Sequence, residues 1–146
     1  MIEENINAIG SLKIELFNDL GVLVQEHLLK NLVVTVGKNW ITSRMGGNTA
    51  SIMTHMNLGT GATAPALTDT DLVTPLTRTL LQSSVITDNT VSHVCTFAPG
   101  INTGAITEAG IFNAVTGGTM LNRTTFAVVN KSAADTIVIT WNITIS

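Results

Sequence analysis

The C-terminal segment 136–146 alternates between bulky apolar side chains and smaller or polar ones, and no other pattern constrains the fold as much. Successive side chains of an extended chain point to opposite faces. One face carries Ile137, Ile139, Trp141, Ile143 and Ile145, and the other carries Thr136, Val138, Thr140, Asn142 and Thr144. The first face needs a hydrophobic core opposite it. The alternation therefore predicts a half-buried strand with Trp141 in the core.

Similar patterns recur along the chain, separated by Gly, Asn and Asp residues that favour turns. They predict strands at residues 12–16, 22–29, 32–36, 50–58, 79–87, 91–98, 106–115 and 119–129. Residues 38–45 instead show helical spacing and predict one short helix that closes one end of the core. Many short strands joined by tight turns are typical of antiparallel sandwiches. We therefore predict an all-β fold, an antiparallel β-sandwich or jelly-roll-like domain over residues 12–146, preceded by an N-terminal arm at residues 1–11.

Composition narrows the classes of partner. The chain has 146 residues, is only 12% charged and has a formal net charge of −3, and its seven Lys and Arg residues are scattered. Scattered basic residues form no surface for nucleic acid phosphates. The apolar runs are too short to span a bilayer, and residues 1–4 lack the basic start of a signal peptide. We expect a single soluble domain, made in the cytoplasm, that binds neither nucleic acid nor a membrane.

The residues able to perform nucleophilic or metal chemistry are few and dispersed. His27, His55 and His93 all lie in predicted strands, and Cys95 has no second cysteine with which to form a disulfide. His93 and Cys95 are two residues apart, so they share one face of a strand, which we interpret as a core or interface face. Neither a catalytic triad nor a set of metal ligands is complete. We expect no enzyme activity, no cofactor and no metal.

Two acidic positions leave alternatives open. Asp69 and Asp71 could offer two oxygens to a calcium ion, but such a site needs six or more ligands, so a helix cap or solvated turn is the simpler interpretation. Glu108 stands alone before Ala109 and Gly110 and could act as an acid or base only with a partner. A structural hydrogen bond or salt bridge suits it better, and Arg123 is a candidate partner if the hairpin register brings the two together.

Two segments lack the periodicity that would bury them in their own fold, the arm at residues 1–11 and the long loop at residues 59–75. Neither has the high charge of a freely solvated tail. We therefore expect both segments to bind partners. The candidate partner-binding residues are Ile2, Ile6 and Ile9 in the arm and Pro65, Leu67 and Leu72 in the loop.

Four segments together resemble a family of small virion proteins of tailed bacteriophages. They are NLVVTVGKNWITSRM (31–45), LGTGATAPALTDTDLVTPLTR (58–78), ITEAGIFNAVTGGTMLNRTTF (106–126) and NKSAADTIVITWNITIS (130–146). The TEAGIF element (107–112) also resembles an element found in phage tail-fibre and baseplate modules. The resemblance implies a β-rich structural component of a phage particle, commonly a homotrimer.

The resemblance does not separate the capsid from the tail, but the chain itself favours the capsid. It shows one domain and neither a collagen-like nor a coiled-coil shaft. We expect a capsid decoration (cement) protein, synthesised in the host cytoplasm and located on the head surface of the virion. Its partners would be the major capsid protein, whose subunit junctions it covers, and copies of itself. The alternative is a tail-fibre, tail-adaptor or baseplate structural protein.

Overall fold

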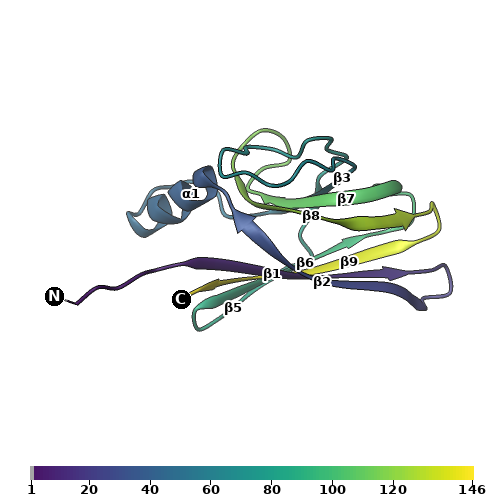
Figure 1. The fold of residues 1–146 in the computed structure, drawn as a ribbon, viewed down its shortest axis with the longest axis horizontal. Coiled ribbons are helices and arrows are strands. Elements are labelled where there is room, and N and C mark those ends of the chain that lie inside the picture. The colour runs from purple at the N-terminus through teal and green to yellow at the C-terminus, as the bar shows by residue number, and fades with distance from the viewer. Residues whose placement is uncertain (1) are drawn as a thin grey trace.

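A computed structural model describes residues 2–146 and shows nine antiparallel strands and one helix (Figure 1). The elements are β1 (Ala8–Phe17), β2 (Leu23–Val33), α1 (Thr35–Met45), β3 (His55–Gly59), β4 (Thr79–Leu80), β5 (Ser83–Thr87), β6 (Thr90–Phe97), β7 (Gly104–Phe112), β8 (Met120–Lys131) and β9 (Thr136–Ile145). All strands belong to one sheet, in the order β4-β3-β7-β8-β2-β1-β9-β6-β5. The mostly β prediction is confirmed.

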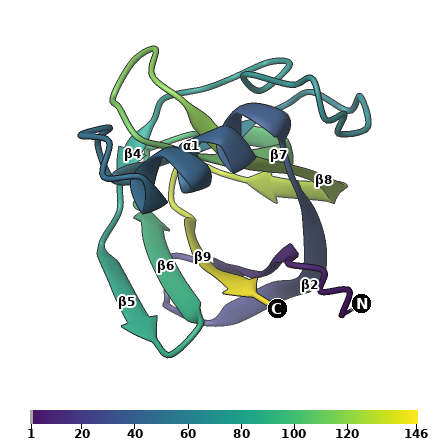
Figure 2. The ribbon, with the colours of Figure 1, turned by 90° about the vertical axis from the view of Figure 1, so that its left-hand side faces the viewer.

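The sandwich prediction is wrong, because the sheet is continuous and curls into a half-barrel (Figure 2). β2 links the two parts of the sheet. It pairs with β1 along most of its length and with β8 only through Leu32 and Val33. A long strand that pairs on both edges joins what would otherwise be two separate layers. The curl also brings β4 near β6, where the thiol of Cys95 on β6 lies 3.7 Å from the carbonyl of Thr79 and 3.6 Å from that of Leu80 on β4.

The first hairpin, β1–β2, differs in its boundaries from the prediction. Its turn is built on Asn18, whose side-chain oxygen accepts hydrogen bonds from the N–H groups of Leu20 and Val22. Residues 22–29 and 32–36 are not separate strands, since β2 runs unbroken from Leu23 to Val33. The arm is also shorter than expected, because β1 begins at Ala8. Met1 lies outside the described residues.

The single helix closes one end of the half-barrel, as predicted, but begins three residues earlier than expected (Figure 2). Trp40 and Ile41 pack against the core. Gly37 lies against β8 so closely that a Cβ atom there would overlap the carbonyl of Leu121. Glycine thus allows α1 to approach the sheet. No helix within residues 2–146 is long and apolar enough to cross a membrane.

The core is centred on β9, and the predicted alternation is confirmed. Trp141 is fully buried between Ile139 and Ile143, and its indole N–H donates to the side-chain oxygen of Asn31 at 2.8 Å. The burial declines at Ile145, where β9 reaches the end of the half-barrel. The strands predicted at residues 91–98, 106–115 and 119–129 are present, and the predicted strand 79–87 is divided into β4 and β5. A tight turn joins β5 to β6, and the β7–β8 hairpin follows.

Candidate functional site

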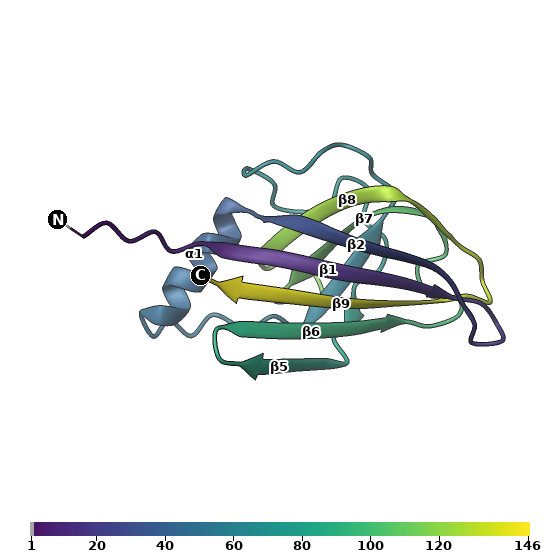
Figure 3. The ribbon, with the colours of Figure 1, turned by 60° about the horizontal axis from the view of Figure 1, so that its bottom comes forward.

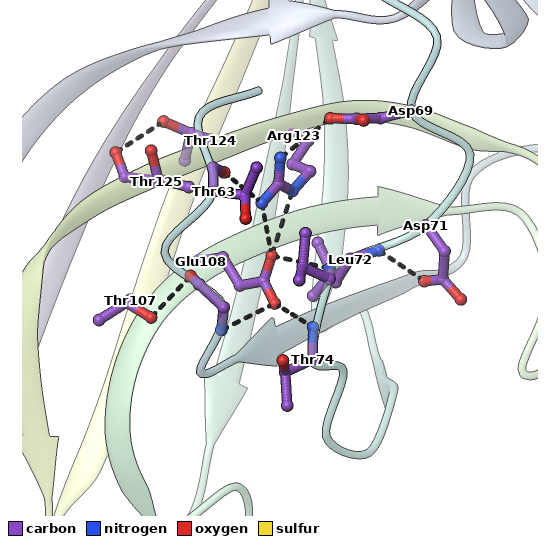
Figure 4. Close-up of polar contacts among 12 residues, drawn as sticks. Thr63, Asp69, Asp71, Leu72, Thr74, Thr107, Glu108, Arg123, Thr124 and Thr125 are labelled. Atoms are coloured by element: carbon purple, nitrogen blue, oxygen red, sulfur yellow. Dashed lines mark hydrogen bonds and ion pairs between the residues drawn. The ribbon is translucent and has the colours of Figure 1, made fainter. Parts of the chain in front are cut away.

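A buried ion pair lies at the centre of the β7–β8 hairpin (Figure 4). Glu108 on β7 and Arg123 on β8 are both fully buried, and Oε2 of Glu108 accepts hydrogen bonds from Nη2 of Arg123 at 2.8 Å and from Nε at 3.1 Å. The strands place the two residues diagonally, because Gly110 is paired with Arg123 and Glu108 with Thr125. The salt bridge that the sequence left open is therefore present.

The carboxylate also binds the backbone of the long loop. It accepts hydrogen bonds from the N–H groups of Gly61 at 3.1 Å, Val73 at 3.0 Å and Thr74 at 2.7 Å. A side chain at Gly61 would occupy the space of the Glu108 carboxylate, so glycine is needed there. Both ends of the loop at residues 59–75 are thus attached to one buried side chain.

The guanidinium of Arg123 holds the middle of the same loop. Nη1 donates to a carboxylate oxygen of Asp69 at 2.9 Å, and Nη2 donates to the backbone carbonyl of Thr63 at 2.7 Å. Asp69 also accepts from the N–H of Ala66 at 2.9 Å and so shapes a tight turn. Asp69 therefore serves a turn and an ion pair. Within residues 2–146, no three His, Cys, Asp or Glu residues lie close enough together to hold a metal ion.

The protonation state of Glu108 follows from these contacts. Burial disfavours its charged form, but the hydrogen bonds from Thr74, Val73, Arg123 and Gly61 outweigh burial and hold the pKa of Glu108 below its usual value. The carboxylate is ionised at neutral pH. Its two oxygens share five donated hydrogen bonds. This arrangement fixes a loop and has no free oxygen directed at a substrate.

The candidate partner-binding residues of the loop take three different positions. Leu67 is exposed, Pro65 is half-buried, and Leu72 is only 5% exposed because it packs with Val34, Phe112 and Met120. The loop was expected to lack anchors in its own fold, and that premise is wrong. The expectation rested on the lack of periodicity within the loop itself. The residues that anchor the loop, Glu108 and Arg123, lie far from it in sequence, so no pattern within the loop indicates them.

The arm contrasts with the loop, since it contacts the fold only at its base. Asn7 continues the ladder between β1 and β9 through two backbone hydrogen bonds with Ser146, each 2.9 Å long. Beyond this point the arm extends away from the sheet (Figure 3). Ile2 is 94% exposed and Ile6 is 72% exposed, and Ile9, within β1, is about half exposed. The structure does not bring arm and loop together into one site.

An apolar groove of about 520 Å³ opens at the same end of the molecule as the arm. Its walls come from α1, the segment after it, the β5–β6 hairpin and the end of β9. The lining residues are Trp40, Ile41, Arg44, Ile52, Met53, Ser84, Ile86, Asp88, Asn89, Thr90, Val91, His93, Leu121, Ile143 and Ile145. Sequence analysis missed this groove, although the helical spacing of Trp40 and Ile41 and the shared face of Val91 and His93 were visible signals.

The groove contains a serine–histidine contact. The hydroxyl of Ser84 lies 2.7 Å from Nδ1 of His93. Burial lowers the pKa of His93 to about 4, so the imidazole is neutral at pH 7. No carboxylate within residues 2–146 forms a hydrogen bond or ion pair with this imidazole, so the third group of a triad is not in place there. His93 and Cys95 lie on the core face of β6, as predicted, and burial raises the pKa of Cys95 to about 12.

A second exposed apolar surface lies at the tip of the β1–β2 hairpin. Leu20, Val22, Leu23 and Val24 are all exposed there, Leu20 to 81%. The tip and the N-terminus lie at opposite ends of the longest axis of the molecule (Figure 1). Clustered exposed apolar side chains usually mark contact sites. The molecule therefore exposes apolar side chains at each end.

The chain matches no protein-family model, no curated protein and no solved structure.

Proposed function

We propose that this protein is a non-enzymatic structural component of a tailed-phage particle, and specifically a capsid decoration protein. It binds over junctions of the major capsid protein and stabilises the head. The resemblance of residues 31–45, 58–78, 106–126 and 130–146 to small phage virion proteins supports a place in the particle. We place this protein on the head because a single domain without a fibrous shaft is what a protein bound to the capsid surface needs.

The observation that carries this proposal is the placement of exposed apolar residues at both ends of one continuous sheet. At the N-terminal end of β1, Ile2 and Ile6 of the arm are exposed, and the apolar groove opens at the same end of the molecule. At the other end, Leu20, Val22, Leu23 and Val24 are exposed at the tip of the β1–β2 hairpin. A protein with two separate contact surfaces can bind a second copy through one surface and a capsid subunit through the other. Joining neighbours over a junction adds buried area that the subunits alone lack.

The sheet edge at β5 supports self-association, and the homotrimer is what the resemblance to phage virion proteins implies. β5, at one edge, has the sequence Ser-Ser-Val-Ile-Thr, and β4, at the other, has Thr-Leu. β4 is too short to pair with another chain, but β5 has five residues and lacks the charged residues that usually prevent such pairing. Ile86 on β5 is 79% exposed. An uncharged edge of this kind favours contact with another copy.

The tail-fibre, tail-adaptor or baseplate function is the second candidate. It is favoured by the TEAGIF element, which resembles an element of tail and baseplate modules. In this chain the element forms most of β7 and supplies Glu108, which anchors the loop. An anchored loop is compatible with a head protein and with a tail protein, so the TEAGIF element alone does not distinguish the two functions.

The number of copies per particle separates the two candidates. Quantitative mass spectrometry of purified particles gives the molar ratio of this chain to the major capsid protein. A decoration protein is present at a ratio of the same order as the capsid protein, whereas a tail protein is present in a few copies. A ratio typical of tail proteins would contradict the decoration proposal, and absence from the particle would contradict both.

A further inference from the structure

We infer that the groove between α1 and the β5–β6 hairpin binds the N-terminal arm, residues 2–6, of a second copy of this chain. Each copy then donates one arm and accepts one arm. The inference rests on the self-association in the proposed function and names the contact that produces it. Such head-to-tail contacts close into a ring when the rotation between copies allows it, and a trimer is one such ring.

The groove has the shape and surface of a site for an apolar segment. Most of its walls are aliphatic or aromatic, and two lining residues, Ile52 and Ile86, remain largely exposed. Covering exposed apolar area of this kind is favourable by about 25 cal/mol per Å². The polar residues on the walls include one cation, Arg44 on α1, and one carboxylate, Asp88 at the β5–β6 turn.

The arm matches this groove in both its apolar and its charged residues. In an extended segment, Ile2, Glu4 and Ile6 point to the same side. The two isoleucines can cover the apolar walls while Glu4 approaches Arg44. Arg44 donates a hydrogen bond to the carbonyl of Ala50 and forms no ion pair with a carboxylate of residues 2–146. Glu4 would sit on the α1 side of the groove, away from Asp88.

The arm of the same copy is poorly placed to fill its own groove. Its hydrogen bonds with Ser146 hold Asn7 in line with β1, so the arm continues outward (Figure 3). A reversal of direction needs a turn of about four residues. Only residues 3–6 separate Ile2 from Asn7, and they include neither glycine nor proline. After a turn, too few residues would remain to place both Ile2 and Ile6 in the groove.

Thiol crosslinking between copies tests this contact directly. Two full-length single variants, Ile2→Cys and Ile86→Cys, are mixed and treated with a short bismaleimide. We expect covalent heterodimers containing one chain of each kind. Val85→Cys is the matched control, because Val85 is also exposed on β5 but does not line the groove. Unmodified protein reports any background from Cys95, which is buried.

The double variant Ile2→Cys/Ile86→Cys separates exchange between copies from folding back within one. Exchange gives covalent multimers, whereas folding back gives an internally crosslinked monomer. An internal crosslink overturns the inference. A lack of heterodimers, or an equal yield with Val85→Cys, overturns it as well.

Charge reversal gives a second, independent readout of the same contact. Glu4→Lys and Arg44→Glu should each weaken self-association about two- to fivefold, measured by sedimentation, and the two changes together should restore it. Glu3→Lys is the matched control, since Glu3 points to the opposite side of an extended arm. Failure of the double variant to recover any association would contradict the pairing of Glu4 with Arg44.

These experiments use purified protein without particles, so their failure can be distinguished from failure of the proposed function. Crosslinked copies that do not bind heads would contradict the decoration function and leave arm exchange standing. Head binding without heterodimers would contradict arm exchange and leave the decoration function standing.

Discussion

Replacing Glu108 with Gln should destabilise the fold strongly. The substitution keeps the size of the side chain but removes its charge. Arg123 would remain fully buried with Asp69 as its only carboxylate partner. The new amide group would also direct N–H groups toward backbone donors of the loop, where the carboxylate accepts hydrogen bonds from Gly61, Val73 and Thr74.

The expected magnitude follows from these lost contacts. Removing one partner of a buried ion pair costs up to about 3–5 kcal/mol, and the ion pair of Arg123 with Asp69 places the expected loss toward the lower end of this range. The free energy of unfolding of an ordinary domain is about 5–15 kcal/mol, so this loss is a large part of its total stability. For a chain of this size the melting temperature should fall on the order of 10 °C.

Urea denaturation of the wild type and the Glu108→Gln variant measures this difference, and its pH dependence adds a second test. Folding lowers the pKa of Glu108 below its ordinary value of 4.5. The stabilisation is therefore fully present above pH 4.5 and is lost as the pH falls through the lower folded value. The difference in unfolding free energy between wild type and variant should shrink on acidification.

Glu15→Gln is the matched control, since Glu15 forms a partly exposed pair with Lys13 at 3.4 Å, unlike the fully buried pair of Glu108. Surface pairs contribute at most about 1 kcal/mol, so this variant should remain close to the wild type. Hydrogen exchange should locate the effect of Glu108→Gln in the loop at residues 59–75. If Glu108→Gln and Glu15→Gln cost the same, or if the loop exchanges no faster, the buried pair does not hold the loop as described.

Three further outcomes follow from the core. Trp141→Ala should cost about 3–5 kcal/mol and Thr140→Ala, on the opposite face of β9, under about 1 kcal/mol in urea denaturation, and equal losses would contradict the assigned faces. Gly10→Ala should cost about 1–3 kcal/mol, because its Cβ would displace the Asn31 side chain that binds the Trp141 indole, and an unchanged midpoint would contradict that packing. Because burial raises the pKa of Cys95 to about 12, Ellman's reagent at pH 8 should label this thiol only after unfolding, and rapid labelling of the native protein would show that the thiol is accessible.

The elements that sequence analysis located well are those in which every local signal agrees. β9 combines an uninterrupted alternation with β-branched residues, and its observed bounds match the prediction to within one residue. The start of α1 was missed because the helix has no recognisable beginning. Its N-cap is Val34, no side chain caps it, and its first turn has no acidic residue. The apolar run into the helix therefore gave the pattern of a strand.

The errors in the fold and the site come from contacts between distant residues. The choice between a sandwich and a half-barrel depends on the pairing of Leu32 and Val33 with β8, which no local pattern encodes. The salt bridge of Glu108 depends on a hairpin register that shifts twice between β7 and β8. The groove is assembled from α1, β5, β6 and β9, so its residues show no common spacing in the sequence.

Add-back of the purified protein to phage heads that lack it tests the decoration function most directly. The measurement is the temperature at which the heads release their DNA, with and without the protein. Binding over capsid junctions predicts saturable binding to heads and a higher release temperature, and deletion of residues 2–6 should reduce both. Binding to tails instead of heads, or saturable binding that leaves the release temperature unchanged, would contradict a role in stabilising the capsid.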